Sequence, residues 1–224
     1  MKNSTQKFRL LVLLFCSFLA VSCSKDDDDE EVIPPLENQL EYNDVTYDLA
    51  TVLSVDLGAA GFSTTETHYG QAFILSDYVA TGTAAPKVIL ELYMFSKGAA
   101  SFGSGTFEFA DVELADAETK YKDKNFFFDS NLLIDLNGDE EMDEDKETFM
   151  IKSGTIKMSG SGTNYNIECD VTLENNKGLR AQYSGVVTPI TIDGDEEDPA
   201  TAGMRKAPKS FFSLSKALKG LKLN

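Results

Sequence analysis

The chain has little cysteine and histidine and no tryptophan. Its 224 residues include 3 Cys, 1 His and 0 Trp. Zinc is usually held by several cysteine and histidine side chains, so this composition excludes a zinc site of the usual kind. A Ser-His-Asp catalytic group would have to use His68, but no nucleophile-elbow motif occurs, and residues 64–69 predict a polar loop. We therefore expect that the protein is not an enzyme.

Positive charge is also scarce. The chain contains 20 Lys and Arg against 37 Asp and Glu, which gives a net charge of −17. Binding to nucleic acid requires basic side chains that neutralise phosphates, so this balance argues against DNA or RNA as a partner. It equally disfavours electrostatic docking of the chain on anionic lipid headgroups.

The apolar run near the N terminus, residues 10–19, is short. It has about ten residues, whereas a helix needs about 20 to cross the hydrocarbon core of a bilayer. Lys2, Lys7 and Arg9 precede the run, and small residues follow it. This order of basic, apolar and small residues predicts a cleavable signal peptide over residues 1–22.

The end of this segment contains a motif around Cys23. Leu19-Ala20-Val21-Ser22-Cys23 resembles the lipobox of bacterial lipoproteins. The resemblance implies that Cys23 is lipidated on its sulfur and becomes the acylated first residue of the mature chain, which carries palmitate-like acyl chains. Several such chains would attach the protein permanently to a membrane, because each buried methylene contributes about 0.8 kcal/mol.

A lysine and six consecutive acids follow the cysteine closely. Like charges repel one another and stay solvated, so residues 23–39 are expected to form a disordered tether. The order Cys-Ser-Lys-Asp resembles the export tag of surface lipoproteins of the Bacteroidota (Bacteroidetes). This resemblance implies an outer-membrane protein displayed at the cell surface, with the periplasmic face as the alternative. The tag comprises Ser24, Lys25, Asp26, Asp27, Asp28 and Asp29.

Residues 40–192 have the pattern of an all-β domain. Apolar, β-branched and aromatic runs of strand length alternate with Gly, Asn, Asp and Pro turns, and no helical period separates them. We predict an antiparallel β-sandwich or barrel. The opening residues 42–47 and the closing residues 153–185 also resemble segments of Bacteroidota lipoproteins. The expected strands lie in residues 40–49 (a hairpin), 70–78, 87–95, 105–109, 125–134, 148–159, 164–173 and 179–187.

Cysteine use in this domain is consistent with a core thiol. Cys16 would leave with the signal peptide and Cys23 would be lipidated, so Cys169 has no disulfide partner within the mature chain. Alternation places Cys169 on the same face as Ile167 and Val171. We therefore predict that Cys169 is buried.

The last segment, residues 193–224, begins with an acidic turn and then changes sign. Residues 204–224 contain six Lys and Arg and no acid. As a helix, this segment places its leucines and phenylalanine on one stripe and its lysines on the other. Three interpretations stay open: the helix packs on the β domain, it lies on a membrane surface, or it is a frayed tail or partner-binding hook.

One acidic loop has the composition of a metal site. Calcium prefers six to eight hard oxygen ligands, and alternate carboxylates in a tight loop can supply them. The spacing of residues 135–147 is similar to that of an EF-hand loop, but Glu140 replaces the glycine at position 6 and Lys146 replaces the acid at position 12. Strand-like flanks argue against a true EF-hand, and the alternative to a looser calcium loop is a solvated hairpin loop. The candidate calcium ligands are Asp135, Asn137, Asp139, Asp143 and Glu147.

No other cofactor is indicated, and the sequence favours a lipid-anchored binding or structural module for an unidentified protein or glycan. Two alternatives come from other classes. One is a hydrolase with a carboxylate pair, which is recognised only by its separation in space. The other is an accessory subunit of an outer-membrane complex. Sugar rings often stack on aromatic side chains, and four tyrosines are candidates for such stacking: Tyr69, Tyr78, Tyr93 and Tyr121.

Overall fold

The structure is a computed structural model, and it describes residues 35–62, 65–79, 84–143 and 146–191. Residues 36–191 belong to one compact unit. The signal peptide, Cys23, the export tag and the basic C-terminal segment all lie outside the described residues, so their assignments stay predictions.

The described residues are arranged almost entirely in strands, which confirms the all-β class. The only helix among them is α2 (Ala117–Tyr121). The strands are β1 (Gln39–Tyr42), β2 (Val45–Asp48), β3 (Thr51–Ala60), β4 (His68–Ser76), β5 (Val88–Lys97), β6 (Gly105–Phe109), β7 (Phe126–Phe127), β8 (Asn131–Ile134), β9 (Thr148–Ser161), β10 (Asn164–Leu173), β11 (Gly178–Val186) and β12 (Thr188–Ile190).

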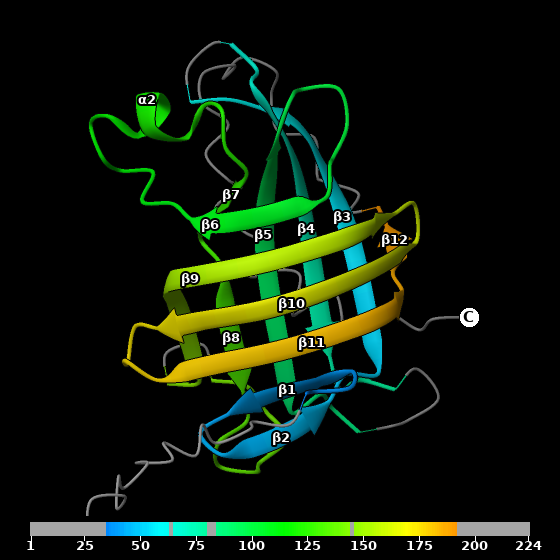
Figure 1. The fold of residues 1–224 in the computed structure, drawn as a ribbon. Helices are drawn as coiled ribbons and strands as arrows, with labels where there is room; N and C mark the ends of the chain where they lie inside the picture. Colours follow the sequence, from blue (N-terminus) through cyan, green and yellow to red (C-terminus); the bar gives the residue numbers. More distant parts are fainter. Residues whose placement is uncertain (1–34, 63–64, 80–83, 144–145, 192–224) are drawn as a thin grey trace, which may run out of the picture. The chain divides into compact units, whose positions relative to one another are not determined.

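The strands form two crossing layers (Figure 1). One layer has the order β12-β3-β4-β5, and the other has the order β9-β10-β11-β1-β2. The layers join because β8 pairs with both β5 and β9, while β7 pairs with β5 and β6 pairs with β7 and β9. The ring β5-β7-β6-β9-β8 is thereby closed into a five-stranded barrel. Pairing is antiparallel except for β6 with β7 and β12 with β3.

The two layers enclose an inner apolar core. In β10 and β11, buried and exposed residues alternate, so one face of this layer packs inward and the other meets solvent. Cys169 lies on the inward face and is 3% exposed, which confirms the prediction of a buried thiol. Burial raises the pKa of this thiol, since the charged form is disfavoured away from water. The largest buried side chains of this core include Phe73, Phe107, Phe127, Leu40, Leu90 and Leu92.

A second apolar cluster lies on the opposite face of the β3-β4-β5-β8 layer. We call this the outer face. β5 is buried at nine of its ten positions, which is the pattern of a strand covered on both sides. The outer-face cluster includes Leu53, Val55, Ala72, Ile74, Ile89, Tyr93, Phe95 and Leu133.

The structure departs from the predicted elements in four places, one of which is the short strand β12, which was not predicted. The expected strand over residues 125–134 is divided into β7 and β8, because Asp129 between them has a φ of 53°, which an extended strand cannot accommodate. Strand β3 was not predicted, and neither was α2. The predicted hairpin over residues 40–49 is confirmed as β1 and β2, joined at Asn43 and Asp44, whose φ angles are both positive.

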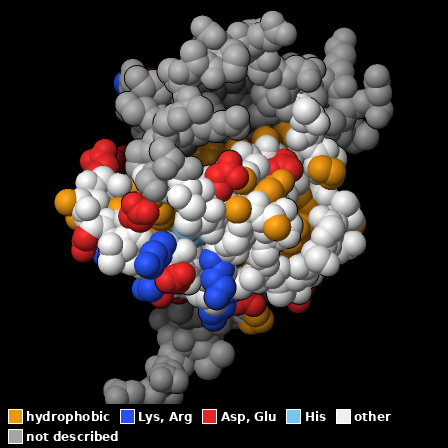
Figure 2. All heavy atoms as spheres, turned by 90° about the horizontal axis from the view of Figure 1, so that it is seen from above, with side chains coloured by type: hydrophobic (Ala, Val, Ile, Leu, Met, Phe, Trp, Pro, Cys, Tyr) orange, Lys and Arg blue, Asp and Glu red, His pale blue; other side chains and the backbone are white. Residues whose placement is uncertain are grey.

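The end of the domain that carries α2 has a mixed surface. Figure 2 views this end, and acidic and basic side chains are intermingled on it. Lys124 Nζ lies 3.4 Å from Glu108 Oε2, and both side chains are more than half exposed. An exposed pair of this kind contributes at most about 1 kcal/mol to stability.

Candidate functional site

The acidic loop connects β8 to β9, two strands of the closed barrel. Its base is closed by backbone hydrogen bonds: the Ile134 amide donates to the Glu147 carbonyl at 2.9 Å, and the Asp135 amide donates to the Lys87 carbonyl at 2.9 Å. The first and last predicted ligands, Asp135 and Glu147, therefore lie at the two roots of one loop. The barrel strands fix where the loop begins and ends.

Asp135 organises the first turn of the loop. Its two carboxylate oxygens accept hydrogen bonds from the backbone amides of Gly138 at 2.6 Å and Glu140 at 3.1 Å. Gly138 and Glu140 have positive φ angles of 77° and 65°. The sharp turn at position 6 of the loop is therefore present even though Glu140, and not glycine, occupies it.

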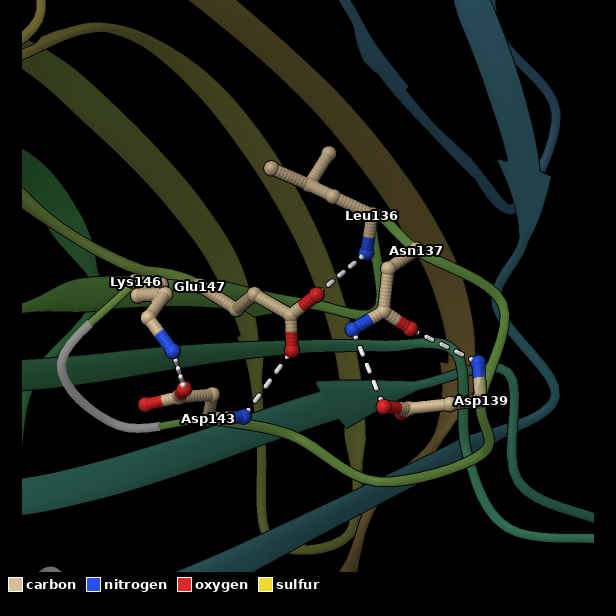
Figure 3. A network of polar contacts seen from close by, with 6 residues as sticks. All are labelled: Leu136, Asn137, Asp139, Asp143, Lys146 and Glu147. Carbon is tan, nitrogen blue, oxygen red and sulfur yellow. Dashed lines mark hydrogen bonds and ion pairs between the residues drawn. The ribbon is translucent and has the colours of Figure 1, made fainter.

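Asn137 and Asp139 form the next turn (Figure 3). Asn137 Oδ1 accepts from the Asp139 amide at 2.8 Å, and Asp139 Oδ1 accepts from the Glu141 amide at 2.9 Å. Asn137 Nδ2 also donates to Asp139 Oδ2 at 3.0 Å. These are side-chain turns in which each oxygen binds the backbone two residues further on.

Glu147 binds both sides of the loop from within. Its carboxylate accepts from the Leu136 amide at 2.9 Å and from the Asp143 amide at 2.9 Å, and the residue is 3% exposed. Figure 3 shows the Glu147 side chain between these two backbone segments. A carboxylate that accepts two backbone N–H groups replaces hydration that it loses on burial. Glu147 is therefore the central stabilising residue of the loop.

Asp143 faces a different partner. Its Oδ2 lies 2.6 Å from Lys146 Nζ, and Lys146 is the residue that replaces the acid at position 12 of an EF-hand-like loop. The ammonium group puts a positive charge where such a loop would have a ligand. This arrangement lowers the attraction of the loop for a cation at the Asp143 end.

The structure thus places all five predicted calcium ligands on one loop but directs their oxygens mainly to backbone amides and to Lys146. Within the described part of the chain, no group of three or more His, Cys, Asp or Glu side chains is arranged to hold a metal ion. Each carboxylate oxygen has two lone pairs, so a hydrogen bond does not exhaust its capacity to bind. Calcium binding by this loop stays a prediction for titration.

The sequence pattern predicted that His68 lies in a polar loop, and this prediction is wrong. It is the first residue of β4 and is 1% exposed, with Phe62 and Phe126 against its ring. Its Nε2 lies 3.2 Å from the Tyr121 carbonyl and 3.0 Å from the Lys124 carbonyl, and its Nδ1 lies 2.8 Å from Thr67 Oγ1. The neutral ring, protonated at Nε2, satisfies these contacts and holds the α2 segment against β4.

Burial lowers the pKa of His68, although the two carbonyls and Asp123 act in the opposite direction. The ring therefore stays neutral over a wider pH range than an exposed histidine. Both ring nitrogens contact structural groups, which supports a role for His68 in folding.

Sequence reasoning missed a polar group on the outer face. Glu91 Oε2 accepts from Tyr93 Oη and from Asn131 Nδ2, each at 3.2 Å, and all three residues are buried. The pKa of Tyr93 is strongly raised, mainly by burial and next by the negative charge of Glu91. One feature of the sequence could have revealed this polar group: Glu91 is an acid within the apolar run 88–95. Acidic side chains are rarely buried without polar partners, so a buried strand with this pattern indicates such partners.

The other candidates from the sequence are placed as follows. Tyr93 and Tyr121 are each 4% exposed, so neither offers an open ring for stacking on a sugar, whereas Tyr69 and Tyr78 are half-buried. Desolvation also raises the pKa of Asp129, which has a positive φ between β7 and β8. No helix in the described part of the chain has the length and apolar character needed to span a bilayer.

Comparison of the chain with models of protein families, with curated proteins and with solved structures found no match.

Proposed function

We propose that this protein is a lipoprotein of the outer membrane, anchored through Cys23 and displayed at the cell surface, whose β domain acts as a binding or structural module. The observation that carries the proposal is the order of segments at the N terminus: a basic region, a short apolar run, Leu19–Cys23, and then Ser24–Glu31 with its lysine and six acids. This order supports cleavage before the cysteine, lipidation of its sulfur and an extended acidic tether.

The described domain supports a non-catalytic role through the position of its titratable groups. The lone histidine binds two backbone carbonyls within a buried aromatic group. Glu147 binds backbone amides in its own loop. These groups stabilise structure and are poorly placed for general acid–base chemistry on an outside molecule, which requires access to the reacting group.

Lipidation is tested by expressing the full chain in a bacterium of the Bacteroidota and feeding the cells an alkyne-tagged palmitate. We expect the label to appear on the parent protein and to be lost in Cys23→Ala, while Cys169→Ala, which removes the buried thiol, keeps it. Mass spectrometry should give a mature chain that begins at Cys23. Equal labelling of the parent and Cys23→Ala would refute the anchor.

Surface display is tested separately by adding protease to intact cells. We expect the parent protein to be degraded while a periplasmic control protein survives. A variant with Asp26–Asp29 replaced by alanine should stay membrane-bound and become protected, because it keeps the lipid but lacks the tag. Protection of the parent protein would place the domain on the periplasmic face and leave the lipid anchor intact.

A second candidate property is weak calcium binding by the 135–147 loop. The observation that favours it is the left-handed conformation of Glu140 at position 6, which gives this acidic loop a tight turn without glycine. Extracellular calcium modules bind with dissociation constants of about 0.1 to 1 mM. Calorimetric titration of the chain from Ser24 should show saturable heat that Asp139→Ala removes and Lys146→Glu strengthens. Absence of heat up to millimolar calcium would make the loop a solvated connection.

A further inference from the structure

The two layers of the domain differ in the burial of the faces that point away from the inner core. In β10, exposed residues alternate with buried ones, so the far face of that layer is polar. In β4 and β5, residues directed to both faces are buried, and the outer face presents Leu53, Ile74 and Ile89, which are 1–2% exposed. A sheet that is apolar on both faces requires a second covering layer.

Several described segments outside the central strands pack against the outer-face cluster. Ala117 and Tyr121 of α2 pack at one end, Met142 of the acidic loop packs against the cluster, and Ile190 of β12 packs at the β3 side. Among the described helices and strands, those that contact β3 and β4 extensively are their neighbours in the same sheet. An apolar segment from outside the described elements could complete this cover.

The chain leaves the described domain beside this face. β12 runs parallel to β3 with Ile190 opposite Val55, and Val55 belongs to the outer-face cluster. Residues 192–203, which include the acidic turn, can span up to about 40 Å when extended. Residues 204–224 could thus reach any part of the outer face.

The length and pattern of residues 204–224 fit the face. Pro208 suits the first turn of a helix but would break a helix interior, so a helix from Pro208 to Asn224 would have 17 residues and extend about 25 Å. Strands β3, β4 and β5 have 9 or 10 residues and extend about 30 Å, so such a helix would cover most of their length. The apolar stripe of such a helix would consist of Phe211, Leu214, Leu218 and Leu221.

Charge favours the same arrangement. Residues 35–191 contain 26 Asp and Glu and 10 Lys and Arg, a net charge of −16, whereas residues 204–224 contain six Lys and Arg and no acid. A basic segment is therefore attracted by the net negative charge of this domain.

We propose that residues 208–224 form an amphipathic helix that covers the outer face of the β3-β4-β5-β8 layer of the same chain, with Phe211, Leu214, Leu218 and Leu221 packed on Leu53, Ile74, Ile89 and Leu133. The helix completes the fold as a third layer. The basic stripe then faces solvent and gives the acidic domain one basic surface.

The absence of tryptophan allows a direct test, since one introduced tryptophan reports only its own surroundings. The chain from Ser24 is used, so that the apolar residues 10–19 cannot occupy the face. We expect Leu218→Trp to emit at short wavelength and to resist quenching by acrylamide. The matched control Lys216→Trp, on the opposite stripe, should emit at long wavelength and be quenched freely.

Cross-linking then identifies the covered face. Leu57, a half-buried residue of the outer-face cluster, is replaced by cysteine together with Leu218→Cys, and a bifunctional maleimide is added. Cys169 is buried and should remain unreacted in the folded protein. We expect an intramolecular link between Leu57→Cys and Leu218→Cys. The control pairs Leu218→Cys with Glu168→Cys, on the exposed face of β10, and should give no link.

Three results would overturn the proposal. Free quenching of Leu218→Trp, with no link, would show that the segment does not cover the domain. Links only between two chains would assign the face to a second copy. Emission from Leu218→Trp that shifts only when anionic lipid vesicles are added would assign the segment to a membrane surface.

Discussion

Removal of the Glu147 carboxylate is the sharpest test of how the acidic loop is held. This buried side chain accepts two backbone hydrogen bonds, from Leu136 and Asp143, each at 2.9 Å. A hydrogen bond to a charged group contributes about 1.5–3 kcal/mol. Because the loop borders solvent, water can partly replace the lost acceptor, so we take the lower value for each bond. Glu147→Ala should then lower the free energy of unfolding by about 3 kcal/mol.

The assay is urea unfolding of the chain from Ser24, followed by far-ultraviolet circular dichroism. In a domain of this size, a loss of about 3 kcal/mol corresponds to a fall in Tm of about 6–12 °C. Glu141→Ala is the matched control, because it removes an exposed acid from the same loop. It should change the free energy of unfolding by less than about 0.5 kcal/mol. If Glu147→Ala unfolds like this control, Glu147 does not hold the loop.

Three further predictions concern other parts of the domain. Burial lowers the pKa of His68 below its ordinary value of 6.5, so the unfolded chain binds a proton more readily; stability should be constant above that pH and fall as pH drops through 6.5. The contribution of one proton to this slope is at most about 1.4 kcal/mol per pH unit. His68→Gln should remove that contribution from the free energies of unfolding measured in urea between pH 8 and pH 5.5; an unchanged slope would assign it to other groups. Gly154 has a φ of 120°, and an added Cβ would lie 2.4 Å from the Asp170 carbonyl oxygen. Gly154→Ala should therefore cost at least about 2 kcal/mol in urea unfolding, whereas Gly178→Ala, where a Cβ has open space, should cost less than about 1 kcal/mol; similar costs would contradict the strain argument. The Cys169 thiol is buried with a raised pKa, so in the chain from Ser24 it should react with a thiol reagent only after urea is added, and rapid reaction of the folded protein would show that β10 opens readily.

Local periodicity determined the elements that have one solvated face. β6 and β10 have the predicted bounds, residues 105–109 and 164–173, because alternation of apolar and polar residues marks both the strand and its inward face. The burial of Cys169 follows from the same alternation. The turn between β1 and β2 could be predicted because Asn and Asp tolerate positive φ.

Periodicity was insufficient where a strand is buried on both faces or where tertiary contacts determine the conformation. β3 ends in Gly58-Ala59-Ala60, a composition typical of a loop, and is a strand because it pairs with β4 and β12. The apolar run 125–134 bends at Asp129 because β7 pairs with β6 and β8 pairs with β9. Burial of His68 depends on aromatic rings and carbonyls more than 50 residues further along the chain, which a local pattern cannot reveal.

The sequence by itself determined the all-β class, the inward face of each alternating strand and the presence of an acidic loop, because these depend on neighbouring residues. Only the tertiary structure decided that the two layers close into a barrel through β7 and β8, and that Glu147 binds backbone amides across its own loop. The physical reason is the same in both cases. Strand pairing and the satisfaction of buried polar groups join residues that are distant along the chain, and their partners are fixed only when the whole domain packs.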